Sequence, residues 1–87
     1  MKIDSNLKFL RKAHNLTYAK LEEQTGINHS KIQRIEIGTT KDPQVTDINK
    51  LAKFFGVPLD DFVNEDLEKN DIDKEIAEKQ TILFGGH

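Results

Sequence analysis

The sequence predicts a small all-α domain, and three features of the 87-residue chain lead to this prediction. Apolar residues recur at helical spacing in several short segments. Residues that begin or end helices stand between those segments, among them Thr17, Gly26, Asn28 and Gly56. Apolar residues make up 36% of the chain and charged residues 32%, which is typical of one soluble domain with a modest core.

The first helix is expected over residues 4–13, where apolar side chains form one stripe. Asp4 or Ser5 is expected to cap its start, because a short oxygen-bearing side chain accepts a backbone N–H of the first turn. Asn15 follows the helix at a position that suits a left-handed residue. The stripe consists of Ile3, Leu7 and Leu10.

Two short helices joined by a tight turn are expected over residues 17–25 and 28–36. Thr17 is the expected N-cap of the first, and Gly26 ends it because glycine accepts a positive φ at little cost. Asn28 is the expected N-cap of the second helix. The apolar residues that hold this pair in place are Leu16, Leu21, Ile27, Ile32 and Ile35.

The outward positions of the second of these helices carry polar side chains of one kind. Nearly all of them donate hydrogen bonds, and none is acidic, whereas a surface helix normally mixes the two charge signs. This pattern indicates a partner that is anionic and accepts hydrogen bonds. The residues are His29, Ser30, Lys31, Gln33 and Arg34.

Two further helices are expected in the next third of the chain. The fourth begins between Gln44 and Thr46 and ends at Gly56. The fifth is short and has Pro58 near its first turn, where a missing N–H costs little. The residues expected to be buried here are Val45, Ile48, Leu51, Ala52 and Phe55 of the fourth helix, with Leu59 and Phe62 of the fifth.

The segment from Leu16 to Gly38 resembles the helix-turn-helix of the lambda-repressor/Cro-like (XRE) family, and residues 3–62 fit the family's five-helix domain. The resemblance implies a regulator of transcription, most simply a repressor, that binds a double-stranded DNA operator as a homodimer. The matching residues are Leu16, Thr17, Leu21, Thr25, Gly26, Ile27, Asn28, His29, Ser30, Ile32, Ile35, Glu36 and Gly38.

The resemblance also assigns DNA contacts. His29, Ser30 and Arg34 match the positions that contact bases, and Arg34 has the geometry for bidentate binding to guanine O6 and N7. The implied phosphate contacts are Tyr18, Asn28, Lys31, Gln33, Thr39, Thr40 and Lys41.

Arg11 and Glu36 match two positions that form an ion pair in the family, tying the first helix to the end of the recognition helix. Three positions depart from the family pattern. Tyr18 replaces a glutamine that bonds to the DNA backbone, and Ile37 replaces an asparagine. Glu22 stands where the family has a small residue, so we expect it to turn outward or to pair with a cation such as Lys31.

The charge of −2 is unevenly distributed. Residues 1–64, the predicted DNA-binding domain, hold 10 Lys and Arg against 8 Asp and Glu, and residues 65–87 hold 3 Lys against 7 Asp and Glu. The last segment is expected to be an acidic linker and tail with a helix over residues 72–81. An alternative function follows from it, in which an antitoxin or a protein-interaction module binds a protein partner through this tail.

Other function classes lack support in the sequence. There is no cysteine, the three histidines lie far apart, and neither serine lies in a nucleophile motif, so we expect no catalytic site, no metal site and no cofactor. No apolar run approaches the ~20 residues of a membrane span, and no signal peptide is evident, so we expect a cytoplasmic protein with no membrane partner.

Overall fold

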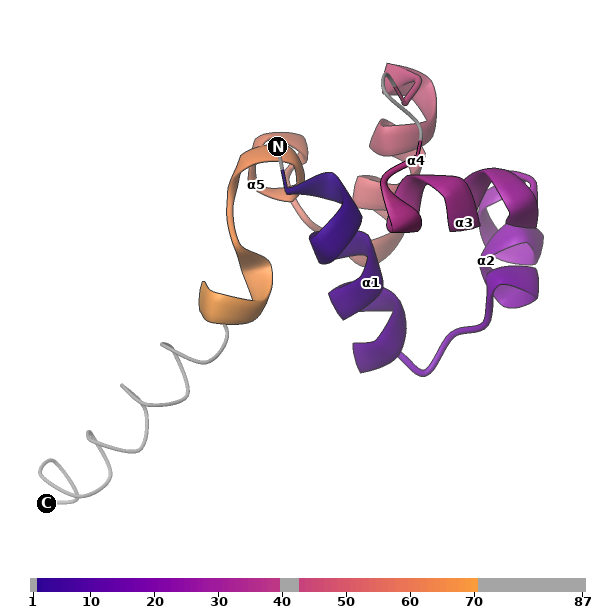
Figure 1. The fold of residues 1–87 in the computed structure, drawn as a ribbon, viewed down its shortest axis with the longest axis horizontal. Helices are drawn as coiled ribbons and strands as arrows, with labels where there is room; N and C mark the ends of the chain where they lie inside the picture. Colours follow the sequence, from indigo (N-terminus) through magenta and orange to yellow (C-terminus); the bar gives the residue numbers. More distant parts are fainter. Residues whose placement is uncertain (1, 40–42, 71–87) are drawn as a thin grey trace, which may run out of the picture.

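The computed structural model describes residues 2–39 and 43–70, and these residues are helical, with connecting turns and no strand. This confirms the all-α prediction (Figure 1). One further helical turn, at residues 67–70, ends the described part of the chain. The helices are α1 (Ile3–Ala13), α2 (Tyr18–Thr25), α3 (His29–Ile37), α4 (Val45–Phe55) and α5 (Leu59–Asn64).

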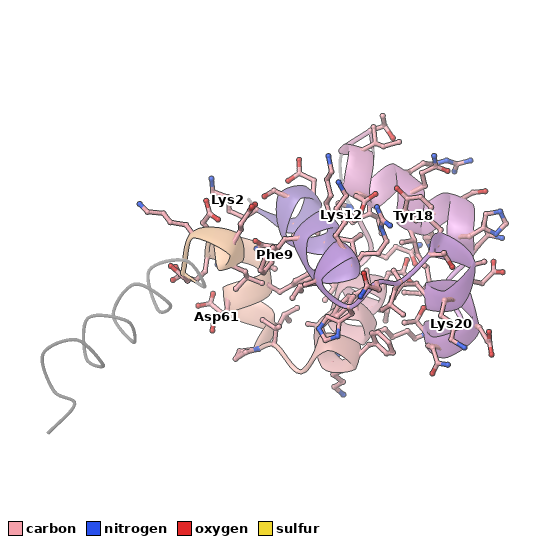
Figure 2. The ribbon with its side chains drawn as sticks, turned by 90° about the horizontal axis from the view of Figure 1, so that it is seen from below. Lys2, Phe9, Lys12, Tyr18, Lys20 and Asp61 are labelled. Carbon is pink, nitrogen blue, oxygen red and sulfur yellow. The ribbon has the colours of Figure 1, made fainter. Side chains whose placement is uncertain are left out.

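A single apolar core joins all five helices. α3 packs against α1 and α2, while α5 packs against α1 and α4, so α1 lies between α5 and the α2–α3 pair (Figure 1; Figure 2). The predicted stripes of α1, α2 and α3 are buried as expected. The core residues are Ile3, Leu7, Leu10, Leu21, Ile27, Ile32, Ile35, Ile48, Leu51, Ala52 and Phe62.

Two residues predicted to be buried are exposed. Val45 exposes 71% of its surface and Leu59 exposes 37%. Each is the first residue of its helix. Because side chains in a helix lean toward its N-terminus, the first residue leans past the end of the helix and away from the core. Apolar spacing alone therefore extends the buried face one residue too far.

The predicted N-caps of the helix-turn-helix pair and the predicted end of α2 are confirmed, and α3 ends at Ile37, one residue later than expected. The Thr17 hydroxyl accepts a hydrogen bond from the Lys20 backbone N–H at 3.1 Å, and Asn28 Oδ1 accepts one from the Ser30 backbone N–H at 2.9 Å. Gly26 ends α2 with a φ of 77°, in the left-handed region. These caps satisfy backbone donors that the first turn of each helix leaves unpaired.

The prediction that Asp4 or Ser5 caps α1 is wrong. The helix begins at Ile3, and no side chain caps it. A tertiary contact fixes this end of the helix instead, because the Lys2 backbone N–H donates to the Val63 carbonyl oxygen at 2.7 Å. Asp4 lies inside the first turn, where its side chain accepts from the Ser5 backbone N–H.

Asn6 is a buried polar residue that joins α1 to α5 and to the chain that follows it. It is 1% exposed, and its side-chain nitrogen donates to the carbonyl oxygens of Phe62 at 2.8 Å and Glu65 at 2.7 Å. Its Oδ1 accepts from the Leu67 backbone N–H at 3.1 Å. Residues 65–67, assigned to the tail by composition, are therefore held against α1. The helix predicted over residues 72–81 lies outside the described residues.

Candidate nucleic-acid interface

The outward face of α3 lies opposite its two buried isoleucines. His29 and Gln33 lie one helical turn apart, and so do Ser30 and Arg34. Ser30 is half-buried, and the other three residues are exposed. We call His29, Ser30, Gln33 and Arg34 the outward strip. The strip is not uniformly polar, because Ile37 lies one turn beyond Gln33 and exposes 61% of its surface.

A network of three side chains holds the C-terminal half of α3 against α1 and α2. Arg11 Nε donates to Glu36 Oε1 at 2.8 Å, and Arg11 Nη2 donates to Glu36 Oε2 at 3.3 Å. The Tyr18 hydroxyl donates to the same carboxylate, and the Arg11 guanidinium carbon lies 4.5 Å from the centroid of the Tyr18 ring. The structure therefore contains the Arg11–Glu36 ion pair that the family resemblance implied, and Tyr18 is a third member of the network.

Glu36 perturbs both of its partners. Its hydrogen bond raises the pKa of Arg11, which remains a cation at all relevant pH values. Its hydrogen bond also raises the pKa of Tyr18, and burial of the ring adds to this increase. Both shifts favour the forms of Arg11 and Tyr18 that donate to the carboxylate.

Tyr18, for which the family resemblance implied a phosphate contact, is engaged within the domain. Its ring is half-buried and its hydroxyl is committed to Glu36 in this structure. The physical reason is that the Glu36 carboxylate, with a side chain 5% exposed, has more acceptor positions than the two donors of Arg11 fill. Tyr18 therefore helps to hold α3 in place, at the position where the family has a glutamine.

Lys31 is also engaged within the domain. Its ammonium group lies 2.6 Å from Asp47 Oδ2 in the first turn of α4 and 3.3 Å from Gln44 Oε1. Asp47 is buried, so the lysine supplies the opposite charge that a buried carboxylate needs. This pair ties α3 to α4, on the opposite flank of α3 from the Arg11 network.

Glu22 pairs with His29 rather than with Lys31. A single oxygen, Glu22 Oε1, accepts from the His29 backbone N–H at 2.9 Å and lies 3.2 Å from His29 Nδ1. The backbone and side-chain hydrogen bonds from His29 lower the pKa of the Glu22 carboxyl. Glu22 thus caps the start of α3 from the neighbouring helix.

The chain after α3 returns toward its last turn. Gly38 has a φ of 86°, and the Arg34 carbonyl oxygen accepts from the backbone N–H groups of Gly38 and Thr39. A side chain at position 38 would also press against α1, because a Cβ there would lie 3.2 Å from Asp4 Oδ2. Thr39 is exposed beside the strip. The predicted phosphate contacts Thr40 and Lys41 lie outside the described residues.

Sequence reasoning missed three structural roles at this site. The hydrogen bonds of Asn6, the pairing of Lys31 with Asp47 and the capping of α3 by Glu22 all join residues from different elements, so no helical spacing reveals them. A signal existed for Glu22, since a charged residue in place of a small one requires a partner.

Two further properties concern the described residues alone. Over residues 2–39 and 43–70, no group of three His, Cys, Asp or Glu side chains is placed to hold a metal ion. In the same part of the chain, no helix is long and apolar enough to cross a membrane.

The amino-acid sequence is similar to known proteins of the helix-turn-helix type. A family model described as helix-turn-helix matches residues 7–62, from the middle of α1 to α5. The chain is also 42% identical, over 65 residues, to an uncharacterized HTH-type transcriptional regulator of Methanocaldococcus jannaschii. That match covers 74% of this chain and 97% of the archaeal protein. No solved structure matches the chain.

Proposed function

We propose that this chain binds a double-stranded DNA operator as a homodimer and represses transcription. The chain belongs to the lambda-repressor/Cro-like (XRE) helix-turn-helix family of transcriptional regulators. The observation that carries the proposal is the outward strip of α3. It offers hydrogen-bonding groups without an acidic residue, on a helix narrow enough to enter the major groove.

The support beneath α3 favours the same interpretation. The Arg11–Glu36 pair holds one flank of the helix and the Lys31–Asp47 pair holds the other. A helix fixed at both flanks presents its side chains in one orientation, which base reading requires because each hydrogen bond depends on direction.

We assign base contacts to His29, Ser30 and Arg34, with Arg34 on a guanine. Asn28, Gln33 and Thr39 lie at the rim of the strip, where we assign phosphate contacts, together with Thr40 and Lys41. Lys31 and Tyr18 would have to leave Asp47 and Glu36 to reach a phosphate. We therefore assign these two residues to the support of α3.

A homodimer follows from the small size of the reading surface. One recognition helix contacts only a few base pairs, so specificity for an operator requires two half-sites about one helical turn apart. Repression needs only occupancy of the operator, which a DNA-binding domain supplies without contacts to another protein.

The test is selection of bound sequences from a random double-stranded DNA pool, followed by titration of the selected duplex at several salt concentrations. We expect a motif with two symmetric halves and an affinity that falls steeply with salt, with a log–log slope near −0.9 per phosphate neutralised. A protein that enriches no sequence would contradict the proposal. Such a result would favour the alternative in which residues 65–87 bind a protein partner.

A further inference from the structure

The Glu22 carboxylate contacts His29, which is the proposed base contact whose neutral side chain has two tautomers. A neutral imidazole carries its proton on Nδ1 or on Nε2, and the bare nitrogen accepts a hydrogen bond while the other donates. A carboxylate only accepts, so a hydrogen bond between His29 Nδ1 and Glu22 Oε1, which lie 3.2 Å apart, requires the proton on Nδ1. Turning the ring over would place a carbon against the carboxylate and lose this hydrogen bond.

The position of the carboxylate oxygen is itself fixed. The same Oε1 accepts from the His29 backbone N–H at 2.9 Å. The histidine therefore holds the oxygen with its own backbone and donates to it with its ring. The lowered pKa of Glu22 keeps this group a carboxylate through the neutral range.

The consequence concerns the other ring nitrogen. With Nδ1 protonated, the neutral ring presents Nε2 as an acceptor, and the His29 side chain is 55% exposed at the first residue of α3. In the major groove, the donors that an acceptor can bind are the amino groups of adenine N6 and cytosine N4. Guanine presents only acceptors at N7 and O6.

We propose that Glu22 is a positioning residue that holds His29 in the Nδ1–H form, so that His29 selects a base with an exocyclic amino group, adenine or cytosine, in the operator. This inference rests on the proposed function and names the base class read by one of its residues. Glu22 acts through His29 and does not itself contact DNA.

The protein alone provides the first test. The ¹⁵N chemical shifts of the His29 ring, measured at pH 8 and assigned with His29→Ala, distinguish a protonated nitrogen from a bare one. We expect Nδ1 to be protonated in the wild type and in Glu22→Gln, whose amide oxygen still accepts both hydrogen bonds. We expect Glu22→Ala to shift the ring toward the Nε2–H form. Protonation of Nε2 in the wild type would overturn the inference without involving DNA.

Selection from a random DNA pool at the same pH provides the second test. The base pair read by His29 is the one whose preference disappears in His29→Ala. Each base pair carries one such amino group, on adenine or on cytosine, so the selected operator is also synthesised with that group removed, as purine for adenine or 2-pyrimidinone for cytosine. We expect this removal to weaken binding more in the wild type than in His29→Ala, and the base preference to be weakened about 2- to 10-fold in Glu22→Ala, the value of one neutral hydrogen bond. Glu23→Ala is the matched control, because Glu23 lies on the same helix, is more exposed and pairs with Lys20.

The outcomes separate the two proposals. An equal loss of affinity in the wild type and in His29→Ala when the amino group is removed, or an unchanged preference in Glu22→Ala, overturns the inference while the proposed function stands. A wild-type protein that selects no sequence overturns the proposed function and the base contact with it. A dependence on the amino group in the wild type, weakened in Glu22→Ala and kept in Glu23→Ala and Glu22→Gln, supports the inference.

Discussion

Replacing Arg11 with methionine should be among the most destabilising single changes on the flank of α3. The change removes two charge-assisted hydrogen bonds to Glu36, at 2.8 and 3.3 Å, and a third to the Leu16 carbonyl oxygen at 3.1 Å. It leaves a carboxylate that is 5% exposed with the Tyr18 hydroxyl as its remaining partner. Breaking a buried pair in this way costs ~3–5 kcal/mol. Because Arg11 is 16% exposed, we expect about 3 kcal/mol, near the lower limit.

A double-mutant cycle isolates the pair itself. Neutralising the acid in Glu36→Gln removes the uncompensated charge, so Arg11→Met should cost less in that background, with a coupling of about 2 kcal/mol. The assay is urea unfolding followed by far-ultraviolet circular dichroism. The matched control is Lys12→Met, since Lys12 is an exposed cation of the same helix and should change stability by less than ~0.5 kcal/mol. A cost below ~1 kcal/mol for Arg11→Met would place the pair among ordinary surface ion pairs and refute the reasoning.

Three further predictions concern residues that join separate helices. Asn6→Ala leaves two carbonyl oxygens and one N–H without their partner and should cost about 3 kcal/mol in urea unfolding; a loss below ~1 kcal/mol would show that water replaces the side chain. The pKa of Tyr18 is raised on folding, so the stability that its hydrogen bond supplies is present below pH ~10 and is lost as the pH rises above that value. Tyr18→Phe should therefore reduce the loss of stability at alkaline pH, measured by urea unfolding at pH 8–11. An unchanged profile would contradict the hydrogen bond to Glu36. Lys31→Met should cost ~2 kcal/mol by leaving Asp47 unpaired, and Asp47→Asn should restore part of this loss; equal stability of Lys31→Met and wild type would show the pair to be dispensable.

The sequence predicted the helices well because their signals are local. The caps at Thr17 and Asn28 and the left-handed Gly26 depend on neighbours within three residues, and all three are present. The buried stripes followed from apolar spacing. Val45 and Leu59 failed because spacing does not reveal where a helix leaves the core.

The candidate site was less accessible to sequence reasoning. The residues of the outward strip follow from one helix, so they were identified together. Their supports come from other helices: Glu22 lies seven residues before His29 and across a turn, and Lys31 meets Asp47 from a different element. The structure also shows two of the predicted phosphate contacts, Lys31 and Tyr18, paired with other side chains inside the domain.

The central claim is that the outward strip of α3 reads base pairs, and Arg34→Ala tests it most directly. The measurement compares the affinity of wild type and variant for the selected operator and for random DNA of the same length. We predict a loss of ~1–3 kcal/mol on the operator only, or about 5- to 150-fold, with relaxed preference at one guanine. Lys8→Ala removes the same charge from an exposed position of α1 and should leave the preference unchanged. An equal loss on operator and random DNA, or no loss on either, would contradict the account.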